Sequence, residues 1–136
     1  MLLATAAVAL LAAAGARAET LTFGAALNGA SEVPPNDSKG TGQVTATLDT
    51  ATKAFTYKAT YSGTTGPGVA AHFHGPAAAG ANAPPVVMVA TPASPISGTA
   101  TLTDAQIADL KAGKWYFNVH TAAHAGGEIR GQLTAK

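Results

Sequence analysis

Residues 43–61 read QVTATLDTATKAFTYKATY, and this stretch decides the fold. On both sides of residues 49–52, apolar side chains alternate with polar ones, most of them threonines. Period-two alternation is typical of a strand with one buried face, and a short polar segment between two such runs predicts an antiparallel hairpin. The expected buried face consists of Val44, Ala46 and Leu48 in the first strand and Phe55, Tyr57, Ala59 and Tyr61 in the second.

Similar short runs occur on both sides of this hairpin. They lie at residues 21–25, 69–74, 86–89, 96–102, 115–120 and 128–133. Segments rich in Gly, Pro, Asn and Ser separate them, which predicts about seven to nine short strands with turns between them. We therefore expect an all-β fold, an antiparallel β-sandwich with Greek-key-like connections. Trp115 and Phe117 should join the tyrosines of the hairpin in its core.

One short helix is expected between the strands at 96–102 and 115–120. Thr103 is a suitable N-cap, and Gln106 three residues later completes a capping-box pattern. Ile107 and Leu110 supply a narrow apolar stripe, and Gly113 is placed to end the helix.

The N-terminal residues differ in composition from the rest of the chain. Residues 1–15 are almost entirely Leu, Ala and Val, and Ala16-Arg17-Ala18 supplies a cleavage signal of the A-x-A kind. We predict a signal peptide over residues 1–18 and a single domain over residues 19–136, and hence a periplasmic or secreted protein.

Charge and cysteine content limit the partners. Of the eight Lys and Arg residues, Arg17 lies in the leader, so the remaining chain carries seven, which balance its seven Asp and Glu. A neutral domain argues against nucleic acid or an anionic membrane as a partner after cleavage. Because the chain has no cysteine, any metal must be held by nitrogen or oxygen ligands.

All four histidines fall in two short segments, residues 72–74 and 120–124. In a strand, residues i and i+2 point to the same face with Cα atoms about 6.5 Å apart. His72 and His74 can therefore offer two imidazoles to one ion, while Phe73 is buried on the opposite face. His120 ends a strand, and His124 can fold back through a glycine-rich turn. We predict a metal site formed by His72, His74, His120 and His124; the alternative is that they are polar residues on an ordinary strand face.

An all-nitrogen ligand set suits several transition metals, and copper binds most tightly among the divalent ions. We therefore expect one copper ion. A blue-copper site is excluded because it needs a cysteine thiolate. Zinc held by three histidines and a water molecule is a less favoured alternative.

Several motifs together resemble the CHRD domain, a module named after chordin and common in bacterial secreted proteins. They are residues 27–35 (LNGASEVPP), 70–77 (AAHFHGPA), 102–107 (LTDAQI), 116–121 (YFNVHT) and 127–132 (GEIRGQ). Their order and spacing cover essentially all of residues 19–136. The chain is identified as a member of this family.

A second resemblance concerns the candidate site. The H-x-H strand, the later histidine and an arginine near the end of the chain are similar to the copper half of Cu/Zn superoxide dismutase. The resemblance implies that His72, His74 and His120 are copper ligands and that His124 is a fourth ligand or supports one. It also implies that Arg130 guides superoxide, a small anion, to the metal. No His/Asp cluster for a zinc subsite is present, so a copper-only form is implied.

Some site residues have alternative roles. Arg130 could instead form a surface ion pair with Glu32 or Glu128. Asn118 could orient a ligand, although we favour an ordinary polar strand residue. Glu32 could lie beside the metal, but a carboxylate in a loop is usually solvated.

Three functions remain open at this point: a copper superoxide dismutase, a copper-binding or buffering protein without turnover, and a structural interaction module. We favour the dismutase. Turnover requires an open coordination position and a nearby cation, whereas a carrier would be indifferent to Arg130.

Overall fold

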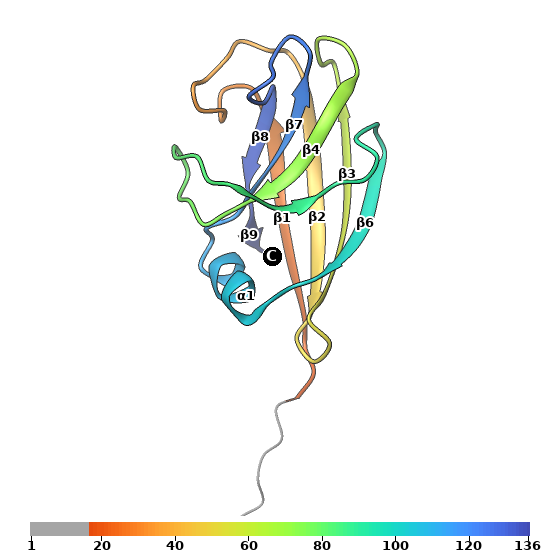
Figure 1. Ribbon diagram of the computed structural model, residues 1–136, viewed down its shortest axis with the longest axis vertical. Coiled ribbons are helices and arrows are strands. Elements are labelled where there is room, and N and C mark those ends of the chain that lie inside the picture. Colours follow the sequence, from red (N-terminus) through yellow and green to blue (C-terminus); the bar gives the residue numbers. More distant parts are fainter. Residues whose placement is uncertain (1–16) are drawn as a thin grey trace, which may run out of the picture.

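The computed structural model describes residues 17–136, which form nine strands and one helix (Figure 1). The predicted leader falls mostly on residues 1–16, outside the described residues. The elements are β1 (Thr20–Asn28), β2 (Thr41–Asp49), β3 (Ala54–Ser62), β4 (Gly68–His74), β5 (Pro85–Met88), β6 (Ile96–Thr101), α1 (Asp104–Lys111), β7 (Tyr116–Thr121), β8 (Ile129–Gln132) and β9 (Thr134–Ala135).

All strand pairs are antiparallel, in the order β5-β4-β7-β8-β1-β2-β3-β6, with β9 paired to β1. β3 and β4 are far apart in this order, yet the rings of Phe55 and Phe73 pack edge-on with centroids 5.1 Å apart. The sheet therefore curls over one core in two facing layers (Figure 1). The predicted all-β, antiparallel sandwich with one short helix is confirmed.

The predicted hairpin is formed by β2 and β3, in a register that pairs Thr41 with Ser62 and Leu48 with Phe55. Every residue of the expected buried face is buried except Tyr61, which is only half-buried. Tyr61 lies near the end of β3, and its hydroxyl donates to the carbonyl of Pro92 at 2.6 Å. A tyrosine can keep its polar end near solvent in this way while its ring covers the core.

The helix has the predicted capping box. The backbone N–H of Gln106 donates to the Thr103 hydroxyl at 3.2 Å, and the backbone N–H of Thr103 donates to the Gln106 side chain at 2.9 Å. Gly113 follows the helix with φ of +73°, a conformation that glycine adopts without steric cost. Leu110 is buried and Ile107 packs on the core. Within residues 17–136, no helix combines the length and the apolar character needed to cross a membrane.

The outer face of β4, β7 and β8 is covered, although a face turned away from the core is usually solvated. The covering comes from the β1–β2 and β4–β5 loops, which lie on the same side of the molecule (Figure 1). The two loops are tied to each other where Asn82 donates to the Val33 carbonyl at 3.3 Å. As a result, Tyr116, Asn118 and Arg130 are buried even though they point away from the core. This second, polar layer contains the candidate site.

Candidate metal centre

Strand β4 places His72 and His74 on this outer face. The residue between them, Phe73, is fully buried in the core, as the alternation of a strand requires. The rings of the two histidines lie with centroids 5.4 Å apart. The predicted pairing of these two imidazoles on one face is confirmed.

His120 reaches the same place from β7. It pairs with Ala70 of β4, which puts it diagonally beside His72. The Nδ1 atom of His72 lies 3.1 Å from the Nε2 atom of His120. His72, His74 and His120 each offer one ring nitrogen, and these atoms all lie within 4.8 Å of one another. Among the described residues, this is the one group of three that could hold a metal ion in this way.

The hydrogen bonds of two of these rings prepare them for a metal. Nδ1 of His74 lies 2.9 Å from the carbonyl oxygen of Ala83, and Nδ1 of His120 lies 2.9 Å from that of Ala125. A carbonyl oxygen only accepts, so Nδ1 of His120 carries the proton and its Nε2 the lone pair. Metal-ligating histidines usually show this arrangement. Both ring nitrogens of His74 face an acceptor oxygen, Nδ1 that of Ala83 and Nε2 the side-chain oxygen of Asn118. Because metal–nitrogen bonds are about 2.0–2.1 Å long, bound nitrogens lie at most about 4.2 Å apart, close to the spacing found.

The environment keeps the ligands unprotonated. Burial lowers the pKa of His72, and the neighbouring rings of His120 and His74 lower it further. Burial is also the main cause of the lowered pKa of His74. Both imidazoles are therefore neutral at neutral pH, the form that binds a metal.

His124 lies outside this group of three. It belongs to the turn between β7 and β8, where its backbone N–H donates to the carbonyl of Thr121 at 3.2 Å and its own carbonyl accepts from Gly127. His124 is half-buried. Its role as a fourth ligand stays a prediction.

Asn118 lies between the histidines. It faces His72 across the β4–β7 pair, and its side-chain oxygen Oδ1 is 2.9 Å from Nε2 of His74. Asn118 is only 1% exposed. Asn118 was considered either as a residue that orients a ligand or as an ordinary polar strand residue. The structure shows a hydrogen bond to a candidate ligand. The amide occupies the nitrogen that a metal would use, so metal binding must replace this bond.

Arg130 forms a buried ion pair with Glu32. Of the two partners considered for Arg130, Glu32 and Glu128, the structure shows Glu32. The Nη2 and Nε atoms of Arg130 lie 3.1 and 3.2 Å from Oε2 of Glu32. The expectation of a solvated Glu32 and a surface ion pair was wrong, because the covering loops exclude water: the Glu32 side chain is 2% exposed and that of Arg130 is 5%. Burial raises the pKa of Glu32, and the charge of Arg130 offsets part of this rise.

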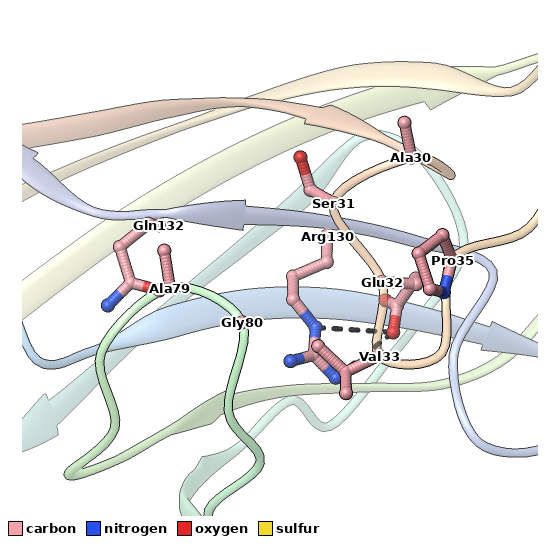
Figure 2. A pocket seen from close by; sticks show the side chains of 9 residues that line it. All are labelled: Ala30, Ser31, Glu32, Val33, Pro35, Ala79, Gly80, Arg130 and Gln132. Atoms are coloured by element: carbon pink, nitrogen blue, oxygen red, sulfur yellow. Dashed lines mark hydrogen bonds and ion pairs between the residues drawn. The ribbon is translucent and has the colours of Figure 1, made fainter.

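The ion pair lines a cavity of about 340 Å³ between the two covering loops (Figure 2). Figure 2 shows Ala30 and Pro35 on one side, Ala79 on the other, and Arg130 projecting between them. Two further acceptors hold the guanidinium: the carbonyl of Ala81 at 3.2 Å and the side chain of Asn82 at 2.7 Å. Arg130 is therefore fixed by the loops and is not displayed to solvent.

Tyr116 is a site residue that the sequence reasoning missed. Its ring stacks on that of His74, with centroids 4.6 Å apart and an interplanar angle of 6°. Arg130 lies over the Tyr116 ring with its Cζ atom 4.0 Å from the centroid. The alternation of β7 could have identified Tyr116 as a site residue, because it places Tyr116 on the same face as Asn118 and His120.

The family model described as the CHRD domain matches residues 23–133. The chain belongs to the CHRD domain family. The matched region of this CHRD domain contains all four histidines together with Glu32 and Arg130. No curated protein and no solved structure gives a significant match.

The CHRD domain thus builds its candidate metal centre from two adjacent strands on the face away from the core. Three imidazoles converge there, and two of them are fixed by backbone carbonyls. Such an arrangement can bind a transition-metal ion.

Proposed function

We propose that this CHRD domain binds one copper ion through His72, His74 and His120. The observation that carries the proposal is the convergence of three ring nitrogens within 4.8 Å. Two of the rings are already oriented by contacts between Nδ1 and backbone carbonyls. A site fixed before the metal arrives loses little conformational entropy on binding.

Copper is favoured over other ions by the ligand set. The ligands are imidazole nitrogens, with no carboxylate among them and no cysteine in the chain. Copper exceeds zinc and nickel in affinity for such sites. Zinc is the main competitor, since it also accepts three histidines.

The site is accessible from one side. His74 is buried, whereas His72 and His120 are partly exposed, so the group is open toward solvent at these two rings. A bound ion could take a fourth ligand from this side. His124, four residues after His120, is our candidate for that position.

Titration of the purified, metal-free protein with Cu(II), in competition with a chelator of known affinity, tests this proposal. We expect one equivalent of copper to bind, and the double variant His72→Ala/His74→Ala to lose it. Parallel titration with Zn(II) decides between the two metals. If the wild type takes up no copper at micromolar concentration, the proposal fails and an interaction module becomes the better description.

The second candidate function is superoxide dismutation at the same centre. The partly exposed rings of His72 and His120 favour it, because a small anion needs an open approach. A bound copper ion would supply one-electron redox chemistry. The resemblance assigns anion guidance to Arg130, but its charge is paired with Glu32, which weakens its long-range attraction.

Pulse radiolysis or a stopped-flow superoxide assay on the copper-loaded protein separates the two functions. Faster superoxide decay in the loaded wild type, absent in the histidine double variant, supports turnover. Unchanged decay supports copper binding or buffering alone. Following the sequence, we place either function in the periplasm or outside the cell.

A further inference from the structure

Three side chains from three neighbouring strands form one continuous stack beside the candidate metal site. His74 of β4 lies parallel to Tyr116 of β7, with centroids 4.6 Å apart. Arg130 of β8 lies over Tyr116, 4.0 Å from its centroid. Since His74 covers one face of the tyrosine ring, the guanidinium must cover the other. Tyr116 is thus held between a candidate metal ligand and a fixed cation.

One backbone group fixes both rings. The carbonyl of Ala83 accepts a hydrogen bond from Nδ1 of His74 at 2.9 Å and another from the Tyr116 hydroxyl at 3.2 Å. The same hydroxyl accepts from the backbone N–H of Ala83 at 3.1 Å. If Tyr116 moved, this carbonyl would lose a fixed partner and would no longer hold the Nδ1 edge of the His74 ring in place.

The other end of the stack is fixed independently. Arg130 donates to Glu32, to the Ala81 carbonyl and to the side chain of Asn82. A buried guanidinium with this many acceptors has one position open to it. A cation over a tyrosine face is also attracted to the ring, which presses Tyr116 into place against His74.

We propose that Tyr116 and Arg130 are positioning residues that hold the His74 ring in the orientation in which it converges with His72 and His120. This deepens the proposed function and rests on it. In this role Arg130 acts through Tyr116, and it does not need to meet solvent or substrate. The role accounts for a buried arginine beside a metal site, which anion guidance does not.

The first test needs no metal. Nitrogen-15 NMR of the metal-free protein reports the hydrogen bonds of the two His74 ring nitrogens. We expect one fixed set of His74 shifts in the wild type, and shifts averaged over several ring orientations in Tyr116→Leu, which removes the ring and the hydroxyl. Tyr116→Phe keeps the stack and loses only the hydroxyl, so its His74 shifts should stay closer to those of the wild type.

The second test uses Cu(II). We expect Tyr116→Leu to weaken Cu(II) binding by about tenfold, the usual cost of losing a group that supports a ligand. The electron paramagnetic resonance spectrum of bound Cu(II) should change with it, and Tyr116→Phe should restore most of the wild-type signal. Tyr61→Leu is the matched control, because Tyr61 also donates its hydroxyl to a backbone carbonyl but touches none of the three histidines.

Arg130→Lys keeps the charge opposite Glu32 while removing the planar group over the ring. This variant replaces Tyr116→Leu if the latter does not fold, and we expect it to alter the nitrogen shifts of His74 as well. Wild-type His74 shifts and copper spectra in both variants would overturn the inference. If the wild type binds no copper, the proposed function fails on its own, and the metal-free NMR comparison still decides whether the stack positions His74.

Discussion

The Nδ1 atom of His72 lies 3.1 Å from the Nε2 atom of His120, across the pair of strands β4 and β7. The two residues are 48 positions apart in the chain. Their approach depends on the register in which His120 pairs with Ala70. This register makes His120, and not the nearby His124, a member of the converging group.

His120→Ala and His124→Ala should therefore differ in copper affinity. His120→Ala removes one of three converging nitrogens, and we expect Cu(II) affinity to fall by a factor of at least about a hundred, since each lost ligand removes a metal–nitrogen bond. His124→Ala should change it by less than about tenfold, because His124 lies outside the three converging rings and water can take the fourth position in its place. Competition titrations of both variants check this, and equal losses would make His124 a full ligand.

Gly127→Ala should disturb both stability and the site. Gly127 has φ of +123°, and a Cβ there would lie 2.6 Å from Oε2 of Glu32 and 2.6 Å from Nδ2 of Asn118. We expect a loss of about 1 kcal/mol or more in the free energy of unfolding, because alanine is strained at positive φ. Copper binding should be kept or strengthened, since the displaced Asn118 no longer occupies the His74 nitrogen that the metal would use.

Gly126→Ala is the control for this variant. A Cβ at Gly126 would meet no atom within 4 Å, and its φ is not positive. Chemical denaturation of both variants measures the difference. Similar losses in the two would show that the turn, and not the contact with Glu32 and Asn118, limits stability.

The metal-free protein should lose stability as the pH falls below about 6.5, the usual pKa of histidine in an unfolded chain. The pKa values of His72 and His74 are lowered in the folded state, mainly by burial. Between the folded and unfolded pKa values, the unfolded chain binds more protons, so acid favours unfolding. The loss should end once the pH is below the folded pKa values.

Denaturation curves from pH 7.5 to 5 measure this effect, with His72→Gln/His74→Gln as the reference. The double variant should show a smaller pH dependence over this range. An identical pH dependence in both proteins would mean that folding does not lower the pKa values of His72 and His74.

Glu128→Gln should destabilise the fold more than any exposed charge change. The buried carboxylate of Glu128 accepts from Ser38 at 2.7 Å, from Thr121 at 2.7 Å and from the backbone of Thr65 at 2.8 Å. It thereby ties two loops to the end of β7. We expect a loss of about 1–3 kcal/mol, the cost of leaving a buried partner unsatisfied.

Asp104→Asn is the comparison, because its ion pair with Lys53 is exposed and should contribute less than about 1 kcal/mol. Urea denaturation compares the free energies of unfolding of the two variants, provided that their m-values equal that of the wild type.

Burial alone would raise the pKa of Glu128, but the hydrogen bonds from Ser38, Thr121 and Thr65 lower it overall. Glu128 therefore stabilises the fold at pH values above the pKa of a glutamate in the unfolded chain. This stabilisation is lost as the pH falls through the lower pKa of Glu128 in the folded protein. A loss in Glu128→Gln no larger than that in Asp104→Asn would contradict this role.

The sequence by itself determined the features that depend on neighbours along the chain. Alternation in residues 43–61 specified the hairpin and its buried face, and Thr103 with Gln106 specified the start of the helix. The H-x-H spacing put His72 and His74 on one face with Phe73 on the other. These are local periodicities, and the geometry of a strand or a helical turn converts them directly into side-chain directions.

Only the tertiary structure decided which distant groups meet. His120 joins the centre through the β4–β7 register, and no local pattern encodes a register between strands. The covering loops have no periodicity, yet they bury Glu32 against Arg130 and press Tyr116 onto His74. A face that alternation marks as solvated thus became a second, polar interior, because loops from elsewhere in the chain exclude water from it.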